Sequence, residues 1–296
     1  MVEAKPQIHD HLTVTPTGAA LGAEISGVNL SSELSDSEFE QIEAAFHQHS
    51  VIFFRNQNLS PDRHVKFTKK FGEIEISPIT QYALPSHPEV LLVTNVEENG
   101  KPIGLADAGR FWHSDISYIE TPPRCSILHA KEVPFENGKS LGETHFVSTA
   151  AAFDDLDDGI KQKAIGLKAI HSFRHKKRAA DTKRDAITRR DQQKERPNVL
   201  HPVIRTHPVT GRKCIYVASD GECIGIEGLP DAEALTLIDY LANHCIQEKF
   251  KYRHQWQVGD VLMWDNCSVQ HKTIKDFDLP LRRLMHRTTV NGTRPV

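Results

Sequence analysis

The 296-residue chain has no long hydrophobic segment, because no run of about 18 consecutive apolar residues occurs. We therefore expect no membrane span. The N-terminus, MVEAKPQIHDHLTVTP, lacks a basic segment followed by an apolar one, and so predicts that the protein is not exported. The formal net charge is only −3, so the composition indicates neither a nucleic-acid partner nor a membrane-surface partner.

Cysteine is scarce, and its five positions do not form a CxxC pair. An odd number of scattered cysteines excludes a closed disulfide framework and a thiolate zinc site of the usual spacing. We expect isolated reduced thiols in a cytoplasmic protein. The cysteines are Cys125, Cys214, Cys223, Cys245 and Cys267.

Short strand-like segments recur along the chain, for example SVIFFR, CSILHA, GDVLMWD and LMHRTTVNG, each rich in β-branched or aromatic residues. Helices are fewer. The capping-box pair Ser35 and Glu38 predicts a helix over residues 39–49. Ser60 as a cap and Pro61 at the first helical position predict a second helix, which Gly72 stops. Residues 148–156 and 231–245 are the other helix candidates. This pattern favours a mainly β fold with peripheral helices, a single domain over residues 1–296 with a sandwich or jelly-roll core.

Residues 174–196 break this pattern, with ten Lys or Arg against four Asp or Glu and almost no large apolar side chain. Such a composition is typical of a solvated, mobile insertion, and a lid over an active site is the functional version of that interpretation. A nucleic-acid patch is disfavoured, because no aromatic residues alternate with the basic ones to stack on bases.

Two His-x-carboxylate pairs could begin a metal site, since side chains two apart on an extended strand point to the same side. In His87-Pro88-Glu89 the proline suggests a turn, so this pair is the weaker candidate. In His113-Ser114-Asp115 a buried aspartate–histidine hydrogen bond is at least as good an explanation as a metal.

A third ligand could come from His271, which follows the apolar segment GDVLMWD. Two imidazoles and one carboxylate on one face suit non-haem Fe(II) with open positions for oxygen. Arg283 and Arg287 follow, and an arginine beside a cavity provides a bidentate fork for a dicarboxylic cosubstrate. The alternative is a surface histidine with solvated arginines.

With these residues in view, the sequence resembles the taurine dioxygenase-like family of Fe(II)- and 2-oxoglutarate-dependent oxygenases, which includes the 2,4-dichlorophenoxyacetate dioxygenases. The resemblance covers about residues 11–293. The segments that carry it include HSVIFFRNQNLSPDRHVKFTKKFGEIE, FWHSDISYIETPP, YRHQWQVGDVLMWDN and RRLMHRTTVNG. It implies a double-stranded β-helix (jelly-roll) core and a homo-oligomer, either a dimer or a tetramer.

The resemblance also implies roles for individual residues. His113, Asp115 and His271 would be the iron ligands, and Arg283 would bind the distal carboxylate of 2-oxoglutarate. Arg287 matches an arginine that reaches the anionic group of the substrate or cosubstrate.

A hydroxyl should share that distal carboxylate. Alignment on TAAAFDDL selects Thr144, whereas counting forward from Asp115 selects Ser140; we favour Thr144. Ser77 stands where taurine dioxygenase carries a histidine for the sulfonate, so taurine is disfavoured as substrate. Ser77, Tyr82, Trp112 and Arg287 are candidates for the pocket lining, although core packing is the better explanation for Trp112 and Tyr82.

The expected function is therefore oxidation, in the first place hydroxylation, of a C–H bond in a small anionic organic molecule. The cosubstrates would be 2-oxoglutarate and O2, and the products would include succinate and CO2. Hydroxylation beside a heteroatom would cleave an ether, sulfonate or amine. Desaturation, an amino-acid or natural-product substrate, and a metal-binding jelly roll without turnover stay open as alternatives.

Overall fold

The computed structural model describes residues 12–106, 109–173, 197–219 and 221–296. The basic segment 174–196 lies outside the described residues. The described part is mostly β-structure, as predicted, and contains no helix long and apolar enough to cross a bilayer. Its helices are α1 (Asp36–His49), α2 (Pro61–Lys69), α3 (Thr149–Asp155), α4 (Asp158–Ala164) and α6 (Asp231–Cys245), with short 3-10 helices η1 (Thr80–Tyr82) and η2 (Glu248–Phe250).

Two of the predicted helix starts are present in full. The Ser35 hydroxyl accepts from the Glu38 backbone N–H while the Glu38 side chain accepts from the Ser35 backbone, which completes the capping box of α1. Ser60 caps α2, with Pro61 as its first residue. Helix α4 is an addition that the sequence patterns do not predict.

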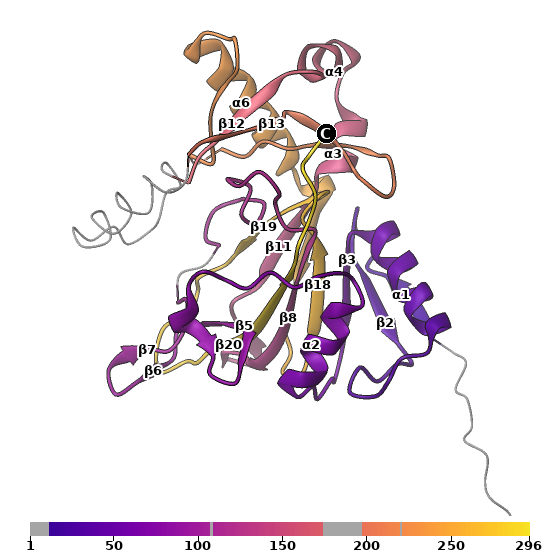
Figure 1. Cartoon of the computed structure of the whole chain (residues 1–296), viewed down its shortest axis with the longest axis vertical. Helices are drawn as coiled ribbons and strands as arrows, with labels where there is room; N and C mark the ends of the chain where they lie inside the picture. Colours follow the sequence, from indigo (N-terminus) through magenta and orange to yellow (C-terminus); the bar gives the residue numbers. More distant parts are fainter. Residues whose placement is uncertain (1–11, 107–108, 174–196, 220) are drawn as a thin grey trace, which may run out of the picture.

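An eight-stranded sheet forms the largest element of the fold (Figure 1), in the order β1-β2-β3-β18-β8-β20-β5-β4. Its pairings are antiparallel except for β2 with β3. The strands are β1 (Thr13–Pro16), β2 (Ala23–Ser26), β3 (Val51–Phe54), β4 (Ala83–Leu84), β5 (His87–Thr94), β8 (Cys125–Glu132), β18 (Val261–Asp265) and β20 (Leu284–Val290).

Strand β3 is a continuous apolar run, and β18 is one up to Asp265, because both faces of the sheet are covered here. Successive side chains point to opposite faces, so β3 divides between two hydrophobic clusters. Phe54 packs with Phe46 of α1 and Phe67 of α2, whereas Phe53 packs with Phe146 of a second sheet. The helices and the second sheet thus enclose the large sheet from opposite sides.

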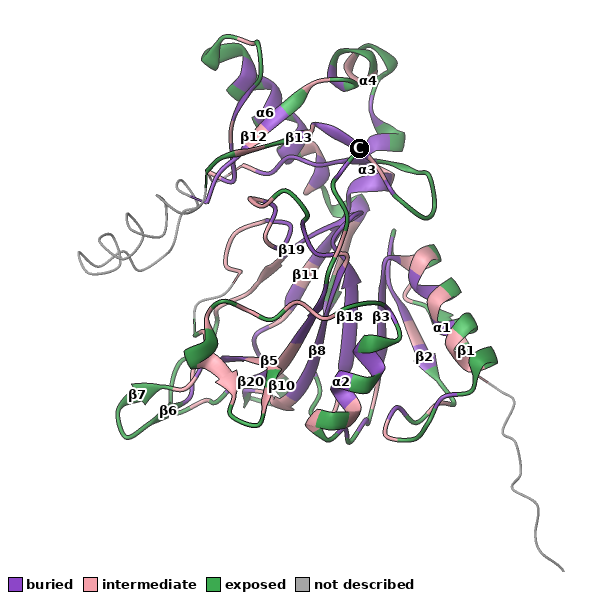
Figure 2. Cartoon of the chain, in the orientation of Figure 1, coloured by how far each residue is buried: buried purple, intermediate pink, exposed green. Residues whose placement is uncertain are grey.

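The second sheet has the order β17-β11-β19. Its strands are β11 (Thr144–Ser148), β17 (Lys251–His254) and β19 (Val269–Thr273). The sequence patterns do not single out β11 and β19, because THFVS and VQHKT are partly polar. The residues of these two strands are nevertheless largely buried. In Figure 2 this burial appears as purple ribbon in the middle of the molecule.

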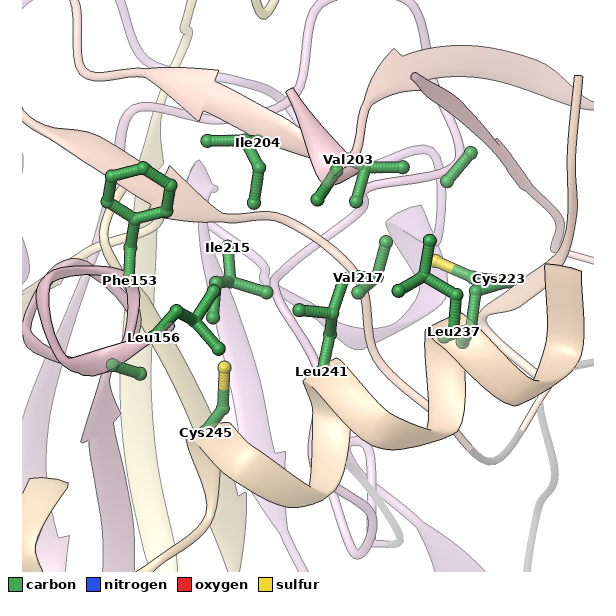
Figure 3. Close-up of a cluster of buried hydrophobic side chains, with 14 of the residues drawn as sticks. Phe153, Leu156, Val203, Ile204, Ile215, Val217, Cys223, Leu237, Leu241 and Cys245 are labelled. Atoms are coloured by element: carbon green, nitrogen blue, oxygen red, sulfur yellow. The ribbon is translucent and has the colours of Figure 1, made fainter. Parts of the chain in front are cut away.

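The long connection between β11 and β17 builds a separate layer of helices and short strands at one end of the large sheet (Figure 1). Figure 3 shows its core, in which Leu237, Leu241 and Cys245 of α6 point toward Val203 and Ile215. The strands of this layer are β12 (Lys168–His171), β13 (Val199–Pro202), β14 (Ile204–Thr206), β15 (Lys213–Ile215) and β16 (Cys223–Ile226). The remaining strands form two short hairpins, β6 (Glu97–Glu98) with β7 (Lys101–Pro102), and β9 (Phe135–Glu136) with β10 (Lys139–Ser140).

Histidines fill part of the interface between α2 and the large sheet. His64 of α2 is completely buried, and its Nε2 lies 3.1 Å from the hydroxyl of Thr288 on β20. The His64 ring packs edge-on against His129 of β8, with ring centroids 6.1 Å apart. Burial lowers the pKa of His64 well below its ordinary value, and lowers the pKa of His129 and of half-buried His286 to about 4.

Acid should therefore destabilise the fold. Below pH 6.5 the unfolded chain takes up protons that the folded histidines accept only near pH 4. The free energy of unfolding should fall across that window by at most about 1.4 kcal/mol per group and pH unit, and by less for His286 because solvent screens it. Urea unfolding at a series of pH values measures this slope. His286→Leu should make the slope shallower, and a free energy of unfolding that stays constant from pH 6.5 to 4 contradicts the prediction.

Candidate metal centre and active site

His113 and His271 are joined by a pair of backbone hydrogen bonds. The His113 N–H donates to the His271 carbonyl over 3.2 Å, and the His271 N–H donates to the His113 carbonyl over 2.9 Å. His271 lies in β19 directly opposite Phe146 of β11, whereas His113 belongs to no strand and forms an isolated bridge. The expectation of an extended strand through His113 and Asp115 is therefore wrong, because the chain turns after Ser114 and Ile116 has φ 48°.

The turn brings Asp115 back toward both imidazoles. The Nε2 atoms of His113 and His271 lie 3.7 Å and 3.9 Å from the same oxygen, Asp115 Oδ1. All three side chains are buried, and their potential ligand atoms lie within 4.8 Å of one another. The Nδ1 atom of His113 lies 2.8 Å from the Phe111 carbonyl, to which its N–H donates a hydrogen bond. That tautomer leaves Nε2 unprotonated and directed at Asp115 Oδ1, as a metal ligand requires.

The second oxygen of Asp115 is held by two donors. Ser126 Oγ on β8 donates to Oδ2 over 2.7 Å, and Arg287 Nη2 on β20 lies 2.9 Å from it. Burial raises the pKa of Asp115, but the charge of Arg287, followed by the interactions with His271 and His113, outweighs burial and holds this pKa well below its ordinary value. Asp115 is therefore an ionised carboxylate with Oδ1 turned to the two imidazoles.

These donors are themselves anchored in the core. The Asn266 amide donates to Ser126 Oγ over 3.2 Å, and Trp264 Nε1 donates to Asn266 Oδ1 over 2.9 Å. A chain of hydrogen bonds thus runs from the buried indole on β18 to the carboxylate of Asp115. The sequence patterns do not single out Ser126 or Asn266; the position of Asn266 in the turn between β18 and β19 was the available signal.

A second buried group of His207, Asp265 and Cys267 lies in the described residues, with ligand atoms equally close together. Its hydrogen bonds do not suit a metal. Nδ1 of His207 accepts from the backbone N–H groups of Val209 and Thr210, so Nε2 carries the proton and donates to Asp265 Oδ2 over 2.6 Å. This cluster holds the turn that carries Asn266.

Arg283 is a buried cation, only 4% exposed. Within the described residues no carboxylate lies within ion-pair distance of its guanidinium, and its Nε has no hydrogen-bond partner. Burial lowers the pKa of Arg283 to about 10. The side chain faces a small cavity of about 20 Å³, lined by Val93, Thr94, Asn95, Leu105, Ala106, Arg110, Thr273, Lys275, Phe277 and Arg283. A buried unpaired cation beside a cavity is suited to an anionic ligand.

Thr144 is the first residue of β11 and is fully buried. Its hydroxyl accepts a hydrogen bond of 3.0 Å from Trp256 Nε1, and the Arg283 guanidinium lies 5.9 Å from the Trp256 ring. The Thr144 proton is thus available for another acceptor. Ser140 instead lies half-buried in the β9–β10 hairpin, opposite Phe135.

The predicted pocket residues lie in different surroundings. Ser77 is half-buried in the loop before η1, and its Oγ accepts from the Ile79 N–H; Tyr82 ends η1, also half-buried. Trp112 packs on the core of the end layer and lies under the ammonium group of Lys272, 5.2 Å away, which favours a packing role.

The weaker His-x-carboxylate pair does not converge on a third ligand. His87 begins β5, and its Nε2 lies 3.1 Å from Asp62 Oδ1 at the surface. The two potential metal groups among the described residues include neither His87 nor Glu89.

The chain belongs to the family described as "Taurine catabolism dioxygenase TauD, TfdA family", whose model matches residues 13–289. It is 35% identical to the alpha-ketoglutarate-dependent 2,4-dichlorophenoxyacetate dioxygenase of Burkholderia sp. (strain RASC), over 92% of this chain and 91% of that protein. It is 30% identical to the alpha-ketoglutarate-dependent sulfate ester dioxygenase of Pseudomonas putida, over 96% and 91%. The crystal structure of a taurine dioxygenase from Burkholderia xenovorans superposes with a TM-score of 0.80 at 30% identity, over 96% and 91%.

The protein is thus a 2-oxoglutarate-dependent dioxygenase, which uses Fe(II), 2-oxoglutarate and O2. The residues present fit these requirements. Two imidazoles and one ionised carboxylate form the donor set of non-haem iron oxygenases, and the unpaired Arg283 Nε suits a carboxylate.

Replacing Arg283 by methionine should stabilise the metal-free protein, because it removes a buried charge that lacks a counterion. We expect the free energy of unfolding to rise by about 1 to 3 kcal/mol. The neighbouring Arg282 provides the control, since it is exposed and bonds both carboxylate oxygens of Glu132. Arg282→Met should change the free energy of unfolding little, because solvent screens an exposed ion pair. A loss of stability in Arg283→Met contradicts the prediction; urea unfolding measures both.

Proposed function

We propose that His113, Asp115 and His271 hold Fe(II), and that Arg283 and Thr144 bind the distal carboxylate of 2-oxoglutarate. The observation that carries this assignment is the convergence of three buried ligand atoms with the His113 tautomer determined by Phe111. Arg283 supports it independently, because a protein that only stores or senses a metal does not require a buried, unpaired guanidinium.

Iron with 2-oxoglutarate and O2 supplies the oxidation of a substrate C–H bond, with release of succinate and CO2. The side chains of this protein orient and shield that chemistry. Ser126 and Arg287 engage Asp115 Oδ2, so that Oδ1 stays directed at the metal position. Trp256 links the two residues, because its indole N–H donates to the Thr144 oxygen and its ring lies 5.9 Å from the Arg283 guanidinium. This arrangement would offer a hydroxyl and a guanidinium to one carboxylate.

The proposed substrate is a small organic anion, and the first oxidation is a hydroxylation. Relatives named for an aryloxyacetate and a sulfate ester support cleavage of an ether or ester after hydroxylation beside the heteroatom. Arg287 lies next to Asp115 and could reach the substrate or cosubstrate anion, and Ser77 and Tyr82 are the remaining pocket candidates. An amino-acid or natural-product substrate is the alternative. We further propose a single domain with a double-stranded β-helix core, formed by the β17-β11-β19 sheet facing the large sheet, in a cytoplasmic homo-oligomer.

Removing any iron ligand should abolish the anaerobic charge-transfer absorption that Fe(II) and 2-oxoglutarate give together. His113→Ala, Asp115→Ala and His271→Ala each remove one of the three donors and should bind Fe(II) at least about 10-fold more weakly. Absorption spectra and Fe(II) titrations under argon measure both effects.

His87→Ala is the matched control, because His87 belongs to the other His-x-carboxylate pair and should leave the absorption intact. Loss of the absorption in this variant alone would mean that the wrong pair has been assigned. Succinate formation with aryloxyalkanoates, alkyl sulfates, sulfonates and amino acids then identifies the substrate class. The dioxygenase function is contradicted if the wild-type protein gives neither the absorption nor succinate.

Thr144→Val should weaken 2-oxoglutarate binding, whereas Ser140→Ala should not. Valine has nearly the shape of threonine but cannot donate to a carboxylate, and a hydrogen bond to a charged group contributes about 1.5 to 3 kcal/mol. That corresponds to a rise of about 10-fold to 150-fold in the apparent Kd for 2-oxoglutarate, which titration of the charge-transfer band measures. The reverse result would transfer the role to Ser140.

A further inference from the structure

Glu222 is a buried carboxylate outside the proposed ligand set. It lies immediately before β16 and is only 4% exposed. Its Oε1 accepts a hydrogen bond of 2.8 Å from Ser117 Oγ and a longer one of 3.4 Å from the Ser114 N–H. Glu222 does not belong to the group of side chains that could share a metal with Asp115. These two contacts therefore concern the turn and leave the metal position to the three ligands.

Both donors flank Asp115 in the turn that departs from the β-bridge. Ser114 precedes the aspartate and Ser117 lies within the turn, after Ile116, which has a φ of 48°. A β-branched residue rarely adopts this backbone region, so the turn needs interactions that hold it in place. Ser114 Oγ also donates to the Val269 carbonyl at the start of β19 over 3.3 Å. The turn is thus fixed to the second sheet by one residue and to Glu222 by two.

The backbone of Glu222 is anchored in the end layer. Its carbonyl accepts from the Ser172 N–H at the end of β12 over 2.9 Å. The next residue, Cys223, is buried in the hydrophobic core of the end layer (Figure 3). The carboxylate therefore connects this layer to a turn that has no regular secondary structure of its own.

We propose that Glu222 is a positioning residue for the iron site, which holds the turn of residues 114–117 so that Asp115 meets the two imidazoles. This inference rests on the proposed function, because it takes Asp115 in this turn to be a metal ligand. Acceptor oxygens of this kind, which hold a ligand from outside the coordination sphere, typically change metal affinity 10-fold to about 100-fold when they are removed. The negative charge of Glu222 is not required for this role, since a glutamine oxygen accepts the same two hydrogen bonds.

The test compares Glu222→Ala, Glu222→Gln and Ser117→Ala in the full chain. Fe(II) is titrated anaerobically into each protein, and amide hydrogen exchange over residues 112–118 is measured without metal. Ser148→Ala is the matched control, because its hydroxyl is also buried and accepts one backbone hydrogen bond, from Ala151, but does not contact the turn. Urea unfolding of every variant separates a loss of overall stability from a loss of positioning.

Glu222→Ala should bind Fe(II) about 10-fold more weakly or worse, and the amide of Ser114 should exchange faster. Glu222→Gln should restore both properties to near the wild-type values, and Ser117→Ala should fall between. Ser148→Ala should change neither at a comparable loss of stability.

Unchanged Fe(II) affinity and exchange in Glu222→Ala would overturn the inference while leaving the iron site intact. An equal loss in Ser148→Ala would also overturn it, because general destabilisation would then explain the effect. Failure of the wild-type protein to bind Fe(II) would instead overturn the proposed function, and with it any role of Glu222 in presenting a metal. The wild-type titration thus tests the proposed function, and the comparison of variants tests the positioning role of Glu222.

Discussion

The two backbone hydrogen bonds between His113 and His271 are the constraint on which the site depends. They connect a segment without regular structure to β19, a strand paired with β11 inside the fold. Since backbone atoms set the spacing, the imidazoles come together without relying on flexible side chains. Asp115 can then complete the site from a short turn, because it has to reach only one point beside the bridge.

The electrostatics of the site are divided between two arginines of β20. Arg287 is neutralised by Asp115, which keeps that carboxylate ionised and directs one of its oxygens away from the imidazoles. Arg283 has no counterion in the described residues, and burial lowers its pKa because it disfavours the charged form. Such a buried charge allows the protein to bind an anion but lowers the free energy of unfolding. Functional sites commonly reduce stability in this way.

Much of the scaffold could be predicted from local patterns. The caps of α1 and α2 depend on residues three apart, and strands β3 and β18 are apolar except for Asp265, so short-range rules suffice. The strands β11 and β19 could not be predicted in this way. Their polar side chains, among them Thr144 and His271, are buried because a site lies between the sheets, and local propensity contains no information about that site. The same reason explains why Glu222 is absent from the sequence-based expectations.

The sequence alone determined the class of the protein and the three residues most suited to a metal, because ligand type, spacing and family likeness are properties of the chain. Only the tertiary structure decided how they meet. It replaced the expected strand through His113 and Asp115 by a bridge and a turn, and it separated the roles of the two arginines. These features depend on hydrogen bonds between residues more than a hundred positions apart, such as Ser114 with Glu222, which no local pattern can encode.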